Sequence, residues 1–556
     1  MNRILLFFVA VFAISLNNPR VTVEADERPK DERPNIVLIL VDDMGYSDLG
    51  CYGGEIETPH IDRLAEDGLR FARFYNSGRC CPTRASLMTG LHPHQAGIGH
   101  MTEAPGRPTG VAGPYQGYLN DRCVTLAEVL QDAGYHTLMT GKWHLGENRP
   151  DSRPRQRGFD RFYGGLSGAF NYFRPGGERG MTEGNEPVAT GADFYATDAF
   201  TDKACEYISQ ATATDERPFF LYLAYNAPHW PLNCKIADYE KYRGRYRTGW
   251  QPVMEARQAK QRQLGLFGPG LAPTPHVGPA WESLNDKQRD DLDAIMAAYA
   301  GCVDSIDQNV GKLRQHLEEI GEWDNTLVFL LSDNGACQER GRLGKGDDAM
   351  VRNPPLETTD GVSLGLCWAN ATNTPFRLYK HFLHEGGART PMIAHWPGGI
   401  AADRRGSIVR SVGWLPDFMP TVLELSGGSQ PADLPDRAGR SLVPLLQEED
   451  RLIHDEPLFW EHEGNAAVRI LDWKLVRQYG KPWELYNLQE DPTEMNDLAT
   501  SDPARRIAMQ ALWENWATAT GVSWPERSLL YQPASNPPRT GNGRQRPAEP
   551  AAAGKR

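Results

Sequence analysis

Uninterrupted runs of aliphatic and β-branched residues recur along this chain, and segments with helical periodicity separate them. Asn35–Val41 reads NIVLILV, and Phe219–Ala224 and residues 326–331 are equally apolar. A strand without polar alternation is buried on both faces, which is typical of a parallel sheet covered by helices. Apolar residues recur at helical spacing from 292 to 317. The alternation predicts an α/β fold, with a large mixed, mostly parallel sheet sandwiched by helices.

The chain has 556 residues, which is more than one compact core usually contains. We expect a main domain over residues 34–450. Within it, residues 235–285 are rich in Gln and Arg and then in Pro and Gly, which predicts a surface insertion. Short strand-like segments and one helical pattern predict a smaller C-terminal α+β subdomain, an antiparallel sheet with a helix, at 451–532. Residues 535–556 have the composition of a disordered tail.

The N-terminus has the pattern of a secretory signal. Arg3 precedes an apolar run over residues 4–16, which is too short to span a bilayer but has the length of a signal-peptide core. Val23-Glu24-Ala25 fits a cleavage site, so we expect residues 1–25 to be removed; an uncleaved anchor is the alternative. The protein is therefore expected to be exported, to the periplasm or the extracellular space, with no membrane span after signal removal.

Charge and cysteine usage exclude several classes of function. The formal net charge is −13, so the surface as a whole does not attract nucleic acid or anionic membranes. An anionic substrate would need a local basic pocket. Nine cysteines are scattered without a CxxC pair, which indicates neither a zinc knuckle nor a redox motif. Their odd number leaves at least one thiol unpaired.

Polar clusters follow the predicted strands, and in open α/β sheets binding sites gather at the carboxyl ends of strands. The clusters are Asp42 and Asp43, Lys142 and His144, His229, and Asp333 and Asn334. Two like charges about 4 Å apart repel by roughly 4 kcal/mol near a protein surface, so three carboxylates in one site require a cation or protons. Oxygen ligands favour Ca²⁺, or alternatively Mg²⁺, over zinc. Taken singly, each acid is better explained as a helix cap or turn residue, and only the acids together favour the metal site.

The most specific motif is segment 80–90, CCPTRASLMTG. It resembles the signature of the type I sulfatases of the alkaline phosphatase superfamily. Within that family, GGLSG at 164–168 and NTPF at 373–376 resemble the arylsulfatases. The resemblance continues in family order through GKWHLG at 141–146, APHW at 227–230, SDNG at 332–335, and Lys380 before EGG at 385–387. It covers nearly the whole mature chain. It implies an alkaline-phosphatase-like fold and hydrolysis of a sulfate ester to an alcohol or phenol and inorganic sulfate.

The resemblance also implies a modified nucleophile and a set of cation ligands. A formylglycine-generating enzyme would oxidise Cys80 to Cα-formylglycine, whose hydrate attacks sulfur and later releases sulfate by re-forming the aldehyde. The formylglycine oxygen would bind the cation. The other implied ligands are Asp42, Asp43, Asp333 and Asn334.

The remaining motif residues receive roles in the same way. Arg84 and Lys142 would hold and polarise the hydrate, and Asp333 would take the proton of the attacking hydroxyl. His144 would accept the remaining hydroxyl proton when sulfate is eliminated. Lys142, His229 and Lys380 would bind sulfate oxygens, and either His229 or Lys380 would protonate the leaving alcohol.

The sequence predicts the reaction more narrowly than the substrate. A sulfated small molecule or a sulfated glycan is expected, because fold resemblance carries the reaction better than the substrate. One alternative is a phosphate or phosphonate ester hydrolase of the same superfamily, since some of those carry the same signature. The other is a non-catalytic relative, which would lack at least one of the essential groups.

Overall fold

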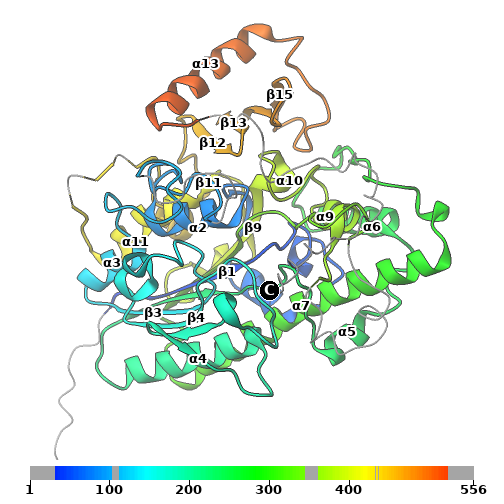
Figure 1. The fold of residues 1–556 in the computed structure, drawn as a ribbon. Helices are drawn as coiled ribbons and strands as arrows, with labels where there is room; N and C mark the ends of the chain where they lie inside the picture. The colour runs from blue at the N-terminus through cyan, green and yellow to red at the C-terminus, as the bar shows by residue number, and fades with distance from the viewer. Residues whose placement is uncertain (1–31, 103–111, 345–360, 432–433, 436, 524–556) are drawn as a thin grey trace, which may run out of the picture.

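The computed structural model describes residues 32–102, 112–344, 361–431, 434–435 and 437–523. The predicted signal peptide and the predicted tail lie outside the described residues. A large sheet crosses the centre of the molecule with helices on both sides, and a smaller C-terminal sheet lies at the top of the view with one long helix above it (Figure 1). The expected fold class is confirmed in both parts.

The large sheet is mixed, and its centre is parallel. Strand β1 (Asn35–Val41) pairs in parallel with β7 (Phe219–Ala224) and β8 (Thr326–Ser332). Beyond β8, strand β9 (Arg389–His395) runs antiparallel to both of its neighbours. The strands on either side of these four are β2 (Leu69–Tyr75), β3 (His136–Gly141), β4 (Arg161–Gly165), β5 (Met181–Glu183), β6 (Glu186–Val188), β10 (Ser407–Val409) and β11 (Gly413–Trp414).

Alternate residues of β1 belong to two hydrophobic cores, one on each face of the sheet. Val37 and Ile39 belong to the first core, and Leu38 and Leu40 belong to the second. The first core is covered by α1 (Pro59–Glu66), α4 (Ala196–Thr212), α5 (Ile236–Tyr242) and α7 (Asp286–Glu319) (Figure 1). The second is covered by α2 (Cys80–Thr89), α3 (Leu126–Asp132) and α11 (Phe418–Ser426). This double cover explains why β1 is apolar from Ile36 to Val41.

Segment 235–285 differs from the expected surface insertion. It contains α5 and α6 (Trp250–Gln263), and α6 packs against α9 (Gly365–Thr372). Tyr242 and Trp250 are buried in the first core. The polar composition did not predict these partly buried helices. Widely spaced aromatic residues bury one side of each helix, while Gln, Lys and Arg occupy the other side.

The C-terminal sheet is antiparallel, with four strands in chain order among the described residues. These are β12 (Leu458–His462), β13 (Asn465–Ile470), β14 (Trp473–Arg477) and β15 (Glu484–Asn487). Helix α13 (Pro503–Ala519) packs on one face through Met509 and Trp513. The other face contacts the main domain near α10 (Glu385–Ala388), and α12 (Val443–Gln447) precedes the linker. In the described ranges, no helix combines the length and apolarity needed to cross a membrane.

Candidate active site

The motif residues converge at the carboxyl edge of the central strands. Asp42 and Asp43 directly follow β1, and Asp333 directly follows β8. Because β1 and β8 are parallel and in register, the two strand ends meet. Lys142 follows β3, and Cys80 is the first residue of α2. The loops after three strands and the first turn of α2 therefore build one site, as expected for an open α/β sheet.

Three buried carboxylates in this site are paired with three buried cations. Lys142 Nζ donates to Asp42 Oδ2 at 2.6 Å. Lys380 Nζ lies 2.8 and 2.9 Å from the two oxygens of Asp43. These four side chains are at most 1% exposed. Pairing of this kind keeps charge tolerable away from water.

Arg84 makes the third pair and also fixes the loop after β3. Its guanidinium donates to Asp333 Oδ2 at 3.0 Å and to the carbonyl oxygen of Lys142 at 2.8 Å. Even so, burial and the neighbouring charge of Asp42 raise the pKa of Asp333 well above its ordinary range. The pKa of Asp42 is lowered, because Lys142, His229 and Arg84 outweigh the effect of burial. Asp333 is therefore the carboxylate that most needs a further positive charge.

The residues fit a hard divalent cation. Asp42 Oδ1 and Asn334 Oδ1 are buried and have no hydrogen-bond partner in the structure. Ligand atoms of Asp42, Asp43 and His229 lie within 4.8 Å of one another. A buried oxygen without a partner is costly, and carboxylate and amide oxygens are what Ca²⁺ and Mg²⁺ prefer. The predicted ligands Asp42, Asp43, Asp333 and Asn334 would hold such an ion.

The backbone at two of these positions is strained. Asp43 has φ +69° and His144 has φ +59°, which side chains other than glycine seldom adopt. Such residues cost of order 1–3 kcal/mol and persist where surrounding contacts hold them, often in active sites. The backbone N–H of Asp43 donates to Asp333 Oδ1 at 3.1 Å, which supplies one such contact.

Cys80 lies at the bottom of this site and is 1% exposed. A hydrogen bond from Cys81 and the positive charges of Lys142 and Lys380 hold the pKa of the Cys80 thiol well below its ordinary value. His144 Nε2 lies 3.1 Å from Cys81 Sγ. The ligand atoms of Cys80, Cys81 and His144 all lie within 4.8 Å of one another.

His229 approaches the same site from the loop after β7. Its Nδ1 donates to the carbonyl oxygen of Trp230 at 2.6 Å. Its Nε2 lies 3.5 Å from Asp43 Oδ2. Burial lowers the pKa of His229. A neutral ring with a protonated Nδ1 would turn the Nε2 lone pair toward a carboxylate, so a proton or a cation is needed between the two acceptors.

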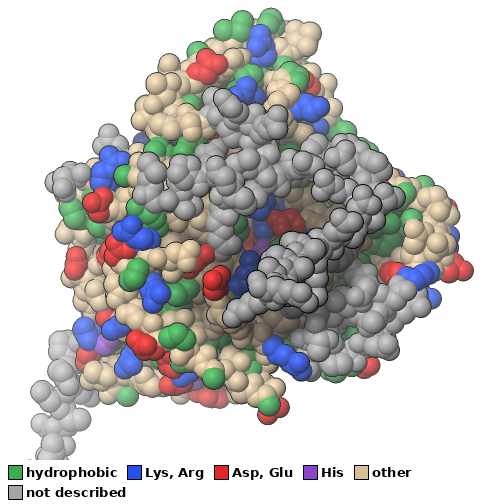
Figure 2. Space-filling view, viewed as in Figure 1, with side chains coloured by type: hydrophobic (Ala, Val, Ile, Leu, Met, Phe, Trp, Pro, Cys, Tyr) green, Lys and Arg blue, Asp and Glu red, His purple; other side chains and the backbone are tan. Residues whose placement is uncertain are grey.

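Every sequence-predicted site residue therefore lies in one constellation. Figure 2 shows a hollow near the centre of this face in which basic, acidic and histidine side chains come together.

Two further groups of residues near the site were not predicted. Glu339 accepts from Arg79 at 2.9 Å and from the Trp230 indole N–H at 2.7 Å. Despite burial, Arg79 and Lys380 lower the pKa of Glu339 to about 2. The sequence feature that could have identified Glu339 as a site residue is its position shortly after the SDNG motif.

The second group comes from the C-terminal sheet. Asn465, at the start of β13, donates to the carbonyl oxygen of His381 at 3.3 Å. The rings of His381 and His462 lie 5.4 Å apart. His381 is the neighbour of Lys380, so the C-terminal hairpin contacts the loop that carries a site residue. Nothing in the sequence connects these two distant segments.

None of the nine cysteines forms a disulfide in the structure. Cys205 is partly buried, and the other eight are buried. Burial, with hydrogen bonding and charge at Cys80, raises the pKa of the Cys81 thiol. The thiol pKa is therefore lowered at Cys80 and raised at the adjacent Cys81.

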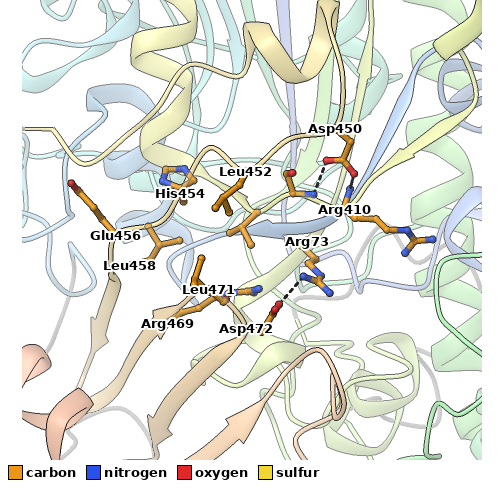
Figure 3. Close-up of a pocket in the computed structure, with 12 residues that line it drawn as sticks. Arg73, Arg410, Asp450, Leu452, His454, Glu456, Leu458, Arg469, Leu471 and Asp472 are labelled. Atoms are coloured by element: carbon orange, nitrogen blue, oxygen red, sulfur yellow. Dashed lines mark hydrogen bonds and ion pairs between the residues drawn. The ribbon is translucent and has the colours of Figure 1, made fainter. Parts of the chain in front are cut away.

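A separate cavity of about 230 Å³ lies at the junction of the two domains (Figure 3). Arg73 and Asp472 point toward one another there, with an N–O distance of 3.0 Å. Asp450 accepts from the backbone N–H of Arg410 at 2.7 Å. Asp450 and Asp472 thus have partners within the cavity, and Glu456 pairs with Arg440 outside its lining. The lining contains no cysteine, so the cavity is a weaker candidate for catalysis.

Comparison with known proteins points to one family. Residues 34–428 match the family model described as Sulfatase, and residues 376–518 match one described as N-sulphoglucosamine sulphohydrolase, C-terminal. The chain is 33% identical over 543 residues to a sulfatase of Schizosaccharomyces pombe, covering 89% of this chain and 96% of that one. It is 34% identical over 416 residues to an arylsulfatase of Klebsiella aerogenes, covering 72% and 88%.

Solved structures agree. The crystal structure of Ps i-CgsB in complex with k-i-k-neocarrahexaose superposes with a TM-score of 0.65 at 28% identity, covering 88% of this chain and 94% of that one. The phosphonate monoester hydrolase of Agrobacterium radiobacter has a TM-score of 0.53 at 20% identity, covering 88% and 96%, and shares the fold.

Proposed function

The chain belongs to the sulfatase family and is a sulfuric ester hydrolase, and on this premise we propose that a Cα-formylglycine derived from Cys80 is its nucleophile and a divalent cation, Ca²⁺ or alternatively Mg²⁺, its cofactor. The observation that carries the proposal is the position of Cys80. It is buried at the start of α2, where a hydrogen bond from Cys81 and the charges of Lys142 and Lys380 lower the pKa of its thiol.

Charge balance supports the cation. Asp42, Asp43 and Asp333 are matched by the three cations bound to them, so the pairs leave no net positive charge for an anionic sulfate. A divalent ion among the carboxylates would supply two positive charges. It would also give partners to the orphaned oxygens of Asp42 and Asn334.

The formylglycine hydrate and the divalent cation would supply the central chemistry. The hydrate of formylglycine, when present, provides a hydroxyl nucleophile and a route to expel sulfate by returning to the aldehyde. A bound cation lowers the pKa of hydroxyls and screens sulfate oxygens.

The protein's own side chains would move protons and bind oxygens. Asp333, whose Oδ1 accepts from the backbone N–H of Asp43 at 3.1 Å, would take a proton from the attacking hydroxyl. His144 lies beside Cys81 and would take the second hydroxyl proton when sulfate leaves. Arg84 and Lys142 would hold the nucleophile in place.

His229 and Lys380 would act on the other side of the sulfate. Both lie against Asp43, within 3.5 Å. Lys380 can donate to a sulfate oxygen, and His229 can do so from Nε2 once its ring is protonated. His229, whose Nε2 faces the site, is placed to protonate the leaving alcohol, with Lys380 as the alternative donor. The donors in this pocket are fixed before substrate arrives, which favours charge development in the transition state.

For the substrate, we propose a sulfated small molecule or a sulfated glycan. The similarity to a protein solved with k-i-k-neocarrahexaose supports a glycan. The similarity to an arylsulfatase supports activity on aryl esters as well. Export through a cleaved signal peptide and maturation by a formylglycine-generating enzyme are parts of the same proposal.

A direct test compares leaving-group-matched esters. Protein produced with a formylglycine-generating enzyme is assayed on 4-nitrophenyl sulfate, 4-nitrophenyl phosphate and a 4-nitrophenyl phosphonate. A higher kcat/KM for the sulfate is expected. A large preference for either phosphorus ester would favour the alternative of a phosphate or phosphonate hydrolase.

A further inference from the structure

Arg257 lies in α6, in a segment that none of the sulfatase motifs covers, yet its guanidinium reaches the loop after β1. The side chain is 1% exposed. One terminal nitrogen donates to Asp48 Oδ1 at 2.7 Å and to Ser47 Oγ at 3.1 Å. The other two nitrogens bind the two oxygens of Glu55 at 2.7 and 2.8 Å. Arg257 thus joins α6 to the loop that carries the cation-site carboxylates.

The Asp48 carboxylate closes this loop. Its Oδ2 accepts from the backbone N–H of Gly45 at 2.7 Å and from the Tyr299 hydroxyl at 2.6 Å. The same hydroxyl lies 3.2 Å from the carbonyl oxygen of Asp43. The contacts therefore run from Arg257 through Asp48 and Tyr299 to the backbone of Asp43.

The backbone of Asp43 requires support of this kind. Its left-handed φ is unfavourable for an aspartate, so neighbouring contacts must hold it. The conformation decides where its carboxylate points, and that carboxylate is one of the proposed cation ligands. A buried Asp48 without Arg257 would tend to take up a proton, because burial raises its pKa to about 6 even with Arg257 beside it.

We propose that Arg257 is a positioning residue of the cation site, which acts through Asp48 and Tyr299 on Asp43. The proposal rests on the cation proposed above. It assigns to segment 235–285 a role in setting cation affinity. Partners outside the first ring of metal ligands typically change affinity by about 10–100-fold when they are removed.

The test is a calcium titration of the full chain after chelation, followed by calorimetry. Arg257→Met is expected to raise the Kd for Ca²⁺ by about 10–100-fold. Tyr299→Phe, which keeps the ring, is expected to change the Kd in the same direction by less. The rise in Tm that a fixed calcium concentration gives should shrink in the same order. If Arg257→Met fails to fold, Tyr299→Phe still tests the connection.

Arg243→Met is the matched control from the same segment. Arg243 pairs with Asp290 at 3.1 Å and also with Asp293, and none of its hydrogen bonds or ion pairs involves the loop after β1. It is expected to lower Tm equally with and without calcium and to leave the Kd unchanged. Wild-type affinity in Arg257→Met would overturn this inference alone. A wild-type protein that binds neither Ca²⁺ nor Mg²⁺ would overturn the proposed cation as well.

Discussion

Two clusters of buried charge differ in what their oxygens contact. The catalytic cluster consists of Asp42, Asp43, Arg84, Lys142, Asp333, Asn334 and Lys380. The junction cluster, between the main domain and the C-terminal sheet, consists of Tyr75, Glu385, Arg389, Lys474 and Glu494. In the catalytic cluster two buried oxygens lack a partner.

In the junction cluster both oxygens of Glu385 have partners. Lys474 Nζ, from β14, lies 2.7 Å from Oε1, and the Tyr75 hydroxyl donates to Oε2 at 2.8 Å. Lys474 also lies 2.9 Å from Glu494. Glu494 Oε1 has this ion pair but no hydrogen bond. Similar chemistry therefore serves two purposes: the catalytic cluster offers carboxylate and amide oxygens that fit a cation, and the ion pairs of the junction cluster hold two domains together.

Removal of Lys380 should have the largest effect on catalysis. Lys380→Met takes away a proposed sulfate-binding charge, and loss of one preorganised donor typically lowers kcat by about 100–1000-fold. Without a cation it also leaves Asp43 short of a buried partner, at a cost of about 3–5 kcal/mol. Kinetics on 4-nitrophenyl sulfate and thermal unfolding with and without calcium measure both. Unchanged kcat/KM would remove Lys380 from the proposed site.

Removal of Lys474 should separate the two clusters. Lys474→Met leaves Glu385 without its closest cation, so we expect a loss of about 3 kcal/mol in the free energy of unfolding. Calcium affinity should stay at the wild-type value, since none of the contacts of Lys474 reaches the cation site. Urea unfolding and calorimetry measure the two quantities. A shifted calcium Kd would show that the clusters are coupled.

The junction cluster should also respond to acid. Burial opposes ionisation of Glu385, but Lys474 and Arg389 lower its pKa to about 2. Because this pKa is below the unfolded value, the stabilisation is present above about pH 5 and is lost as pH falls toward 2, up to about 3 kcal/mol. Glu385→Gln has no such titration. The difference in unfolding free energy between wild type and variant should therefore shrink from pH 6 to pH 3, and a constant difference would contradict the assignment.

An exposed ion pair should show the smallest effect. Lys203 lies 3.2 Å from Glu183 and 3.0 Å from Glu206, but all three side chains are partly solvent-exposed. Lys203→Met should change the free energy of unfolding by less than about 1 kcal/mol. Urea unfolding beside Lys474→Met gives the comparison. Equal losses in the two variants would mean that burial does not decide the strength of these pairs.

The strands and the motif residues of the site were predictable from sequence. Continuous apolar runs such as Asn35–Val41 predict buried strands. In an open α/β sheet, polar residues at the carboxyl ends of such strands are expected to form the binding site. The residues of CCPTRASLMTG lie next to one another in the chain and form one helix, α2, so the motif can be recognised without tertiary information.

The supporting contacts were not predictable. Arg257 lies in a segment of polar composition. Its proposed role depends on a contact with Asp48, which is 209 residues away in the sequence. Lys474 looks like an ordinary strand residue until Glu385 lies opposite it. The buried side of the helices in segment 235–285 was not predictable for the same reason, because it depends on partners that are far away in the chain.

The proposed conversion of Cys80 to the nucleophile changes the mass of its tryptic peptide. Protein produced with a formylglycine-generating enzyme is digested with trypsin, and the peptide from Cys80 to Arg84 is analysed after hydrazine tagging. We expect an aldehyde at Cys80, about 18 Da lighter than the thiol before tagging, and a thiol at Cys81. A thiol or disulfide at Cys80 despite an active maturation enzyme would contradict the mechanism.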